Sequence, residues 1–128
     1  MQTQHETLSD LQFNLETWRR ELRFHFDEMN LFQQKLEEIA RLEFGHSARK
    51  GLENFQNRIM IERAAIADLK HRCKAKIRII DSGNLDEDMQ GLVNATQKPL
   101  KEDMRTYIQM HYDLKEEMMN FFAEYLRE

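Results

Sequence analysis

Apolar residues recur at alternating spacings of three and four along the first third of the chain. Eleven positions follow this rule, and nine of them are apolar: Leu8, Leu11, Leu15, Trp18, Leu22, His25, Met29, Phe32, Leu36, Ile39 and Glu43. This spacing is typical of the buried seam of a helix in a coiled-coil-like bundle. It predicts a helix of about 37 residues, roughly 55 Å long at 1.5 Å per residue.

Two short segments rich in helix-breaking residues divide the chain into three arms. They are Gly45-His46-Ser47 and Ser82-Gly83-Asn84. We expect each Gly to adopt the left-handed conformation after a helix, and Ser47 and Asn84 to cap the next helices. Thr7 with Asp10, or Ser9 with Gln12, would cap the first helix. The helices are thus expected over about 8–44, 47–81 and 85–127.

The seam continues through the second and third arms. Its members are Ala48, Leu52, Phe55, Ile59, Glu62, Ile66, Leu69, Cys73, Lys76 and Ile80, then Leu85, Met89, Leu92, Leu100, Met104, Tyr107, His111, Leu114, Met118, Phe121 and Tyr125. Pro99 predicts a kink or break near residues 95–98, because proline removes a helical hydrogen bond. A break would allow a four-helix bundle as the alternative.

These features predict one all-α domain spanning residues 1–128, an antiparallel bundle of three long coiled-coil-like helices. Folding at the two corners predicts layers across the bundle. One layer would join Leu36, Phe55 and His111. Another would join Met29, Glu62 and Met104.

The charge of the arms favours this pairing. Residues 1–45 hold 5 basic and 9 acidic side chains (−4), residues 46–82 hold 9 and 4 (+5), and residues 83–128 hold 5 and 10 (−5), which sums to −4. A basic middle arm between two acidic arms is expected if it contacts both. Exposed pairs contribute only about 0.2–1 kcal/mol each, so they influence pairing preference more than stability.

Composition limits the classes of function. The net charge of −4 disfavours nucleic-acid binding by the whole molecule. The single Cys73 cannot form an internal disulfide, so we expect a cytoplasmic protein. No apolar stretch approaches 18 residues, so no membrane span is expected. There is no phosphate-binding glycine loop and no nucleophile elbow, so we expect a non-enzymatic protein without a cofactor.

Polar residues interrupt the seam, and three of them raise a second hypothesis. His25, Glu62 and His111 occupy core positions, where a polar side chain needs a partner. Glu62 should lie about one turn from His25 and could bond to it. The main interpretation is that these are core residues bonded to neighbours. A metal- or small-ligand-binding bundle built on the three residues is the alternative.

A run of basic residues raises a third hypothesis. Its members are Lys70, His71, Arg72, Lys74, Lys76 and Arg78. Such a run could bind an anion or a nucleic acid. Pairing with acidic residues of the other arms, Glu16 and Asp86 to Asp88, is the simpler interpretation, and aromatic residues for base stacking are missing from the run.

Apolar residues outside the seam favour an interaction surface. The residues expected at such an interface are Phe24, Leu31, Met118, Met119, Phe122 and Leu126. Contiguous exposed apolar surface usually marks an interface. We therefore expect a homodimer joined partly through the C-terminal helix, or a protein partner, and a role as an interaction or scaffold module.

Overall fold

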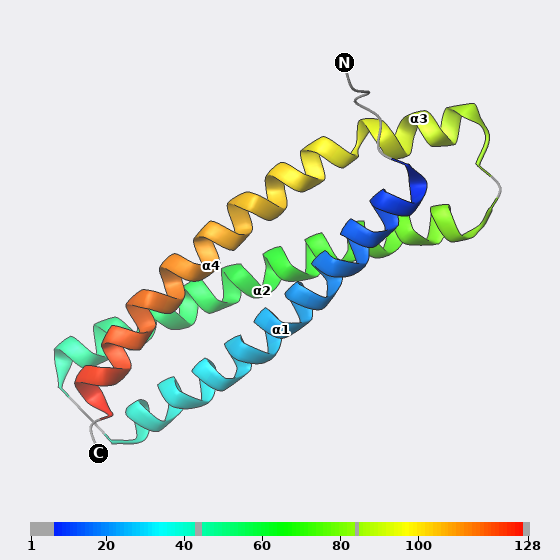
Figure 1. Cartoon of the computed structure of the whole chain (residues 1–128). Coiled ribbons are helices and arrows are strands. Elements are labelled where there is room, and N and C mark those ends of the chain that lie inside the picture. The colour runs from blue at the N-terminus through cyan, green and yellow to red at the C-terminus, as the bar shows by residue number, and fades with distance from the viewer. Residues whose placement is uncertain (1–6, 43–44, 84, 127–128) are drawn as a thin grey trace.

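The computed structural model describes residues 7–42, 45–83 and 85–126, and within them every regular element is a helix. The helices are α1 (Leu8–Arg41), α2 (His46–Asp81), α3 (Glu87–Ala95) and α4 (Gln97–Tyr125). Figure 1 shows an elongated bundle in which α1 and α4 run in the same direction and α2 runs against both. The predicted all-α antiparallel bundle is confirmed.

The seam predicted for the first two arms is the core of the bundle. Eight of its α1 members are buried, and Leu8 and Trp18 pack half-buried against the same core. All ten predicted members of α2 are buried, and Ile77 joins them. Position Glu43 lies outside the described residues.

The third arm bends at Thr96, within the predicted range. Pro99 sits in the first turn of α4, where its missing N–H is tolerated. The Thr96 hydroxyl donates to the carbonyl oxygen of Leu92 at 2.9 Å, which stabilises the bend. Because α3 and α4 follow one another along one arm, they count either as two helices or as one bent helix (Figure 1).

The ends of the helices follow the predicted chemistry only in part. Thr7 and Asp10 form the predicted capping box of α1. Gly83 adopts the predicted left-handed conformation, with φ of 72°. Gly45 does not: its φ is −70°, and it is itself the N-cap of α2, so the prediction of Ser47 as the cap is wrong.

The cap of α3 also differs from the prediction. The Asp86 side chain accepts a hydrogen bond from the backbone N–H of Met89. Asn84, the predicted cap, lies outside the described residues. The seam of this arm is wrong at Leu92, which is exposed, because Val93 faces the core instead.

Two apolar clusters make up the core, one toward each end of the bundle. The first includes Leu11, Leu15, Leu22, Leu69, Cys73, Leu100 and Met104, and the second includes Met29, Leu36, Ile39, Phe55, Ile59, Leu114 and Met118. A layer of buried polar side chains separates them along each helix.

The predicted layers are wrong in the third arm. His111 lies level with His25 and Glu62, rather than with Leu36 and Phe55. The third arm is thus displaced along the bundle relative to the predicted layers, and its first part, α3, lies at the end where α2 finishes (Figure 1). Along the described residues, no helix combines the length and apolarity that crossing a bilayer requires.

Candidate functional site

The polar layer at the middle of the bundle draws one or more residues from each long helix. His25 comes from α1, Glu62 from α2, and Tyr107 and His111 from α4. None of the four side chains is more than 3% exposed. All lie at seam positions, which is why the helical repeat brings them to one level.

The four residues form a connected network of hydrogen bonds. His111 Nδ1 lies 2.6 Å from Glu62 Oε2, and the Tyr107 hydroxyl donates to the same oxygen at 3.3 Å. His25 Nδ1 lies 2.9 Å from the Tyr107 hydroxyl. Glu62 is therefore linked to His25 through Tyr107, and the expected direct bond between them is replaced by this relay.

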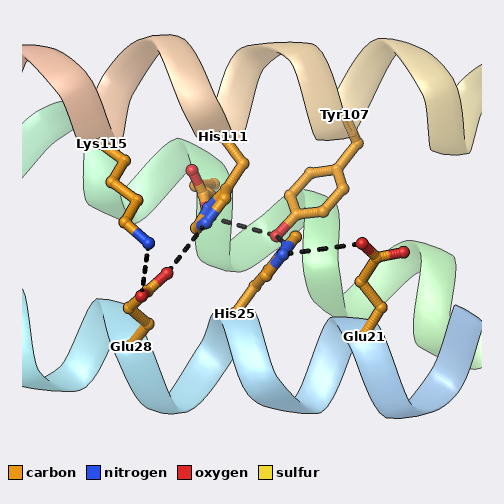
Figure 2. A network of polar contacts seen from close by, with 7 residues as sticks. Glu21, His25, Glu28, Tyr107, His111 and Lys115 are labelled. Atoms are coloured by element: carbon orange, nitrogen blue, oxygen red, sulfur yellow. Dashed lines mark hydrogen bonds and ion pairs between the residues drawn. The ribbon is translucent and has the colours of Figure 1, made fainter.

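Two half-buried residues extend the network toward the α1–α4 surface. Figure 2 shows Glu28 between His111 and Lys115, with Tyr107 and His25 beside them. Glu28 Oε1 lies 3.1 Å from His111 Nε2, and its Oε2 accepts from Lys115 Nζ at 2.7 Å. These contacts lower the pKa of the Glu28 carboxyl against the opposing effect of burial.

Counting protons fixes the donors in this layer. Both ring nitrogens of His111 face carboxylates, which only accept, so a proton must lie in the contact with Glu62 and another in the contact with Glu28. Burial and the charge of Glu62 raise the pKa of Tyr107, which keeps its hydroxyl as a donor. The Tyr107 oxygen then accepts from His25 Nδ1–H.

The acidic and basic side chains of the layer are paired. Glu28 contacts both His111 and Lys115, and Glu62 contacts His111. His25 stays neutral, because burial, and then its proximity to His111, lowers its pKa to about 4. Buried charge is tolerated only when it is paired in this way.

This arrangement bears on the hypothesis of a metal site at His25, Glu62 and His111. The structure does bring the three residues together. However, Glu62 and His111 bond to each other, and the rings of His25 and His111 lie parallel, so their nitrogens do not converge on a common point. Among the described side chains, no group of three or more His, Cys, Asp or Glu is placed to hold a metal ion.

Sequence reasoning missed three members of the layer. Tyr107 was identified only as an apolar seam residue, and Glu28 and Lys115 lie beside the seam. One signal was available: Tyr107 and His111 are four residues apart on α4, and so share a face. Glu28 and Lys115 meet His111 only in the observed register of α1 against α4. The sequence pattern did not determine that register.

The basic run of α2 is divided by the fold. Arg72 bonds to Asp103 of α4 at 2.8 Å and to Asp68 at 3.4 Å. Lys76 is only 8% exposed and donates to Gln97 Oε1 at 2.6 Å, so its place in a surface patch is wrong. The helical repeat turns Lys76 inward, whereas Lys74 and Arg78 face outward.

The remaining members of the run stay near the surface. Lys70 is half-buried, and Lys74 and Arg78 are exposed. Lys74 and Arg78 line a hollow together with Arg19, Ile77 and Asp81, so one carboxylate lies among three basic side chains there.

The predicted interface residues separate into two groups. Phe24, Leu31 and Met119 are 60%, 59% and 51% exposed, and Leu126 is half-buried. The other two predicted members, Met118 and Phe122, are buried in the core.

Their burial has a reason in the helix itself. The seam of α4 passes from Met118 to Phe122, four residues on, rather than to the predicted Phe121. The interface prediction is therefore wrong for Met118, which is fully buried, whereas Phe122 is 8% exposed and lines a surface groove between α1 and α4.

Cys73 is buried in the first apolar cluster. Burial raises the pKa of its thiol to about 11, which leaves little thiolate at neutral pH. The side chain thus acts as a small apolar core residue.

Comparison with known proteins adds no further constraint. The chain matches no family model, no curated protein and no solved structure. Function is therefore inferred from the geometry of the chain alone.

Proposed function

We propose that this chain is a non-enzymatic interaction or scaffold module that self-associates through apolar side chains left outside its own core. The observation that carries the proposal is the exposure of large apolar side chains along the α1–α4 boundary. Leu31 of α1 and Met119 of α4 are each more than half exposed there, and Phe24, seven residues before Leu31 on α1, is 60% exposed.

A groove runs along this boundary and supports the proposal. It has a volume of about 500 Å³ and is lined by Leu31, Phe32, Gln34, Lys35, Met119, Phe122, Ala123 and Leu126. Most of these side chains are apolar. The groove has exposed Leu and Met side chains at its rim and buried Phe rings at its base, a lining that suits the packing of another helix.

The polar layer suits a structural role beneath this face. Its groups are bonded to one another in the interior of the bundle, where they fix the register of the three arms. A module that presents a surface to a partner needs such a fixed frame.

The test is the mass of the native protein in solution. Native mass spectrometry is expected to show twice the 15.5 kDa chain mass, and the melting temperature is expected to rise with protein concentration. At about 0.1 mM protein, even a dimer with a micromolar dissociation constant would form. A protein that stays monomeric up to this concentration would overturn the proposal.

A matched pair of substitutions locates the face. Met119→Glu places a charge in the groove and is expected to weaken association. Met60→Glu on α2 is the control, because Met60 is 67% exposed and lies on another helix. If both variants associate as the parent does, the groove is not the contact.

A further inference from the structure

A small pocket lies between α1 and α2, with a volume of about 140 Å³. Three of the side chains that line it are basic: Arg23 of α1, and Arg63 and Lys70 of α2. None of the described residues that line it is acidic. In a chain whose net charge is −4, this basic pocket is a local site of positive charge.

The acidic residues nearest in sequence do not neutralise the basic pocket. Asp27 and Asp68 lie beside its lining, one on each helix, yet neither lines it. Asp68 instead pairs with Arg72 at 3.4 Å. Within the part of the chain that the structure describes, Arg23 and Lys70 make no ion pair. Like charges around one pocket repel each other, and a bound anion would relieve that repulsion.

The third basic side chain is held in place by a neighbour. Arg63 is half-buried, and its Nη2 donates to Asn30 Oδ1 at 2.7 Å. Its other terminal nitrogen, Nη1, has no hydrogen-bond partner among the described residues. A guanidinium group that is already fixed loses less conformational freedom when it binds a ligand, so Arg63 is suited to hold an anionic head group.

The rest of the lining is apolar. Leu22 and Ile66 are 0% and 2% exposed and belong to the core, whereas Phe26 is 40% exposed and Ala67 is exposed. An apolar base with a few polar groups is typical of a small-molecule site. A cavity of about 150 Å³ holds a benzene molecule, so the apolar part of a ligand here is about one ring in size.

We propose that the basic pocket binds a small organic acid with an apolar body, such as an aromatic carboxylate. The body would lie against Leu22, Phe26 and Ile66, and the carboxylate would accept hydrogen bonds from the three basic side chains. This site goes beyond the self-association proposed above, because its lining shares no residue with the α1–α4 groove.

Three probes separate the two requirements for binding. Benzoate has both the ring and the charge, acetate has the charge alone, and benzyl alcohol has the ring alone. In a titration followed by amide NMR signals, benzoate is expected to shift the signals of residues 22–26 and 63–70, with a dissociation constant of about 1 mM or below. Acetate and benzyl alcohol are expected to bind at least about tenfold more weakly.

Other results of this titration would overturn the proposal. If benzoate leaves these signals unchanged, the pocket does not bind such an acid. If acetate binds as tightly as benzoate, the basic side chains attract anions without using the pocket. If benzyl alcohol binds as tightly, the three cations do not hold a head group.

A matched pair of substitutions tests the pocket while leaving its charge unchanged. Ala67→Phe would fill the pocket and is expected to raise the dissociation constant of benzoate at least about tenfold. Ala64→Phe is the control, because Ala64 is also exposed on α2 but does not line the pocket, and it should bind as the parent does. Benzoate binding in Ala67→Phe equal to that in the parent would overturn the proposal.

A second pair tests the charge. Arg23→Ala is expected to weaken benzoate binding about tenfold, since it removes a charge-assisted hydrogen bond. Arg20→Ala removes an exposed arginine of the same helix that does not line the pocket, and should leave the affinity within about twofold of the parent. Equal weakening by both variants would indicate attraction to general positive charge and overturn the site. Circular dichroism of each variant establishes that it is folded.

Discussion

The rings of His25 and His111 lie face to face in the core, with centroids 3.7 Å apart and planes inclined by 7°. The Tyr112 ring lies nearly perpendicular to both, with its centroid 5.8 Å from that of His25 and 5.1 Å from that of His111. Two imidazolium charges stacked at this distance would repel strongly, so only one ring can hold a charge. The carboxyl groups of Glu28 and Glu62 both contact His111, whereas burial, and then the proximity of His111, lowers the pKa of His25 and keeps that ring neutral.

Acid should therefore destabilise the fold through His25. Its pKa is lowered to about 4 in the folded chain, against 6.5 for an unperturbed histidine. Between these values the unfolded chain binds the proton and the folded chain does not, so stability falls as the pH falls from about 6.5 to about 4. The loss attributable to His25 should be on the order of 2–3 kcal/mol.

Urea unfolding across this pH range measures the effect. His25→Gln, whose amide can still donate to Tyr107, should show a smaller loss than the parent. His71→Gln, which changes an exposed histidine of α2, serves as the control and should follow the parent. Equal pH dependence in the parent and His25→Gln would contradict the assignment of a neutral His25.

Replacing one partner of the Glu62–His111 pair should lower the free energy of unfolding more than replacing both. His111→Leu leaves the fully buried Glu62 carboxylate without its closest partner, and should lower the free energy of unfolding by about 3–5 kcal/mol. Adding Glu62→Leu should recover a large part of that loss. Chemical denaturation of the two single variants and the double variant gives the coupling. Additive losses would show that the pair does not act as a unit.

Lys76 should weaken the fold at neutral pH. Its ammonium group is buried and donates a hydrogen bond to Gln97 Oε1, and burial lowers its pKa to about 8 from 10.5. Between these two values the unfolded chain binds the proton more tightly, so stability should rise as the pH increases from about 8 to about 10.5.

An apolar replacement tests the same point. Because Gln97 Nε2 is also buried without a hydrogen-bond partner among the described residues, the double variant Lys76→Met/Gln97→Leu should be more stable than the parent at pH 7, by about 1–3 kcal/mol. Thermal unfolding at neutral and alkaline pH would reveal the gain, which should shrink at alkaline pH. A double variant less stable than the parent would refute it.

Position 51 should require glycine, because the Phe121 ring packs directly against it. A Cβ at position 51 would overlap the edge of the Phe121 ring, which packs 5.1 Å from the ring of Phe55. Gly51→Ala should therefore destabilise the parent, although alanine favours a helix by about 1 kcal/mol. In the Phe121→Ala background the same change should stabilise by about that amount.

A second glycine supplies the control for this cycle. Gly91 lies within α3, and a Cβ there would meet nothing within 4 Å. Gly91→Ala should raise the free energy of unfolding by about 0.5–1 kcal/mol. If Gly51→Ala and Gly91→Ala behave alike in the parent, the close approach of Phe121 is not what limits position 51.

The sequence predicted the helices and most of their buried faces, because the 3–4 spacing depends only on the geometry of each helix. It placed His25, Glu62 and His111 in the core for the same reason. The register between helices was not encoded in that spacing. A slip of the third arm by about two turns against α2, or about three against α1, leaves the apolar pattern equally satisfied. Glu28 and Lys115 were missed because only the true register brings them to His111.

The interface prediction overstated the exposure of Met118 and Phe122 for a related reason. Near the end of α4 the stretch is apolar on most sides, so the pattern alone cannot separate core from surface. Phe121 contacts Phe55 and Tyr125, while Phe122 packs on Phe32, and only packing decides between them. By contrast, Phe24 and Leu31 lie far from a clear seam, and both are exposed as expected.

The parallel direction of α1 and α4 has a consequence for the order of folding. The hydrogen bonds that join these helices, from His25 to Tyr107 and from Glu28 to His111 and Lys115, span 82, 83 and 87 residues of sequence. While the chain emerges from the ribosome, α1 and α2 can form a hairpin long before these partners are made. In the middle of this hairpin, Glu62 and His25 do not yet have their hydrogen-bond partners Tyr107 and His111. Closure of the bundle must wait for the last quarter of the chain, and contacts of such long range form slowly.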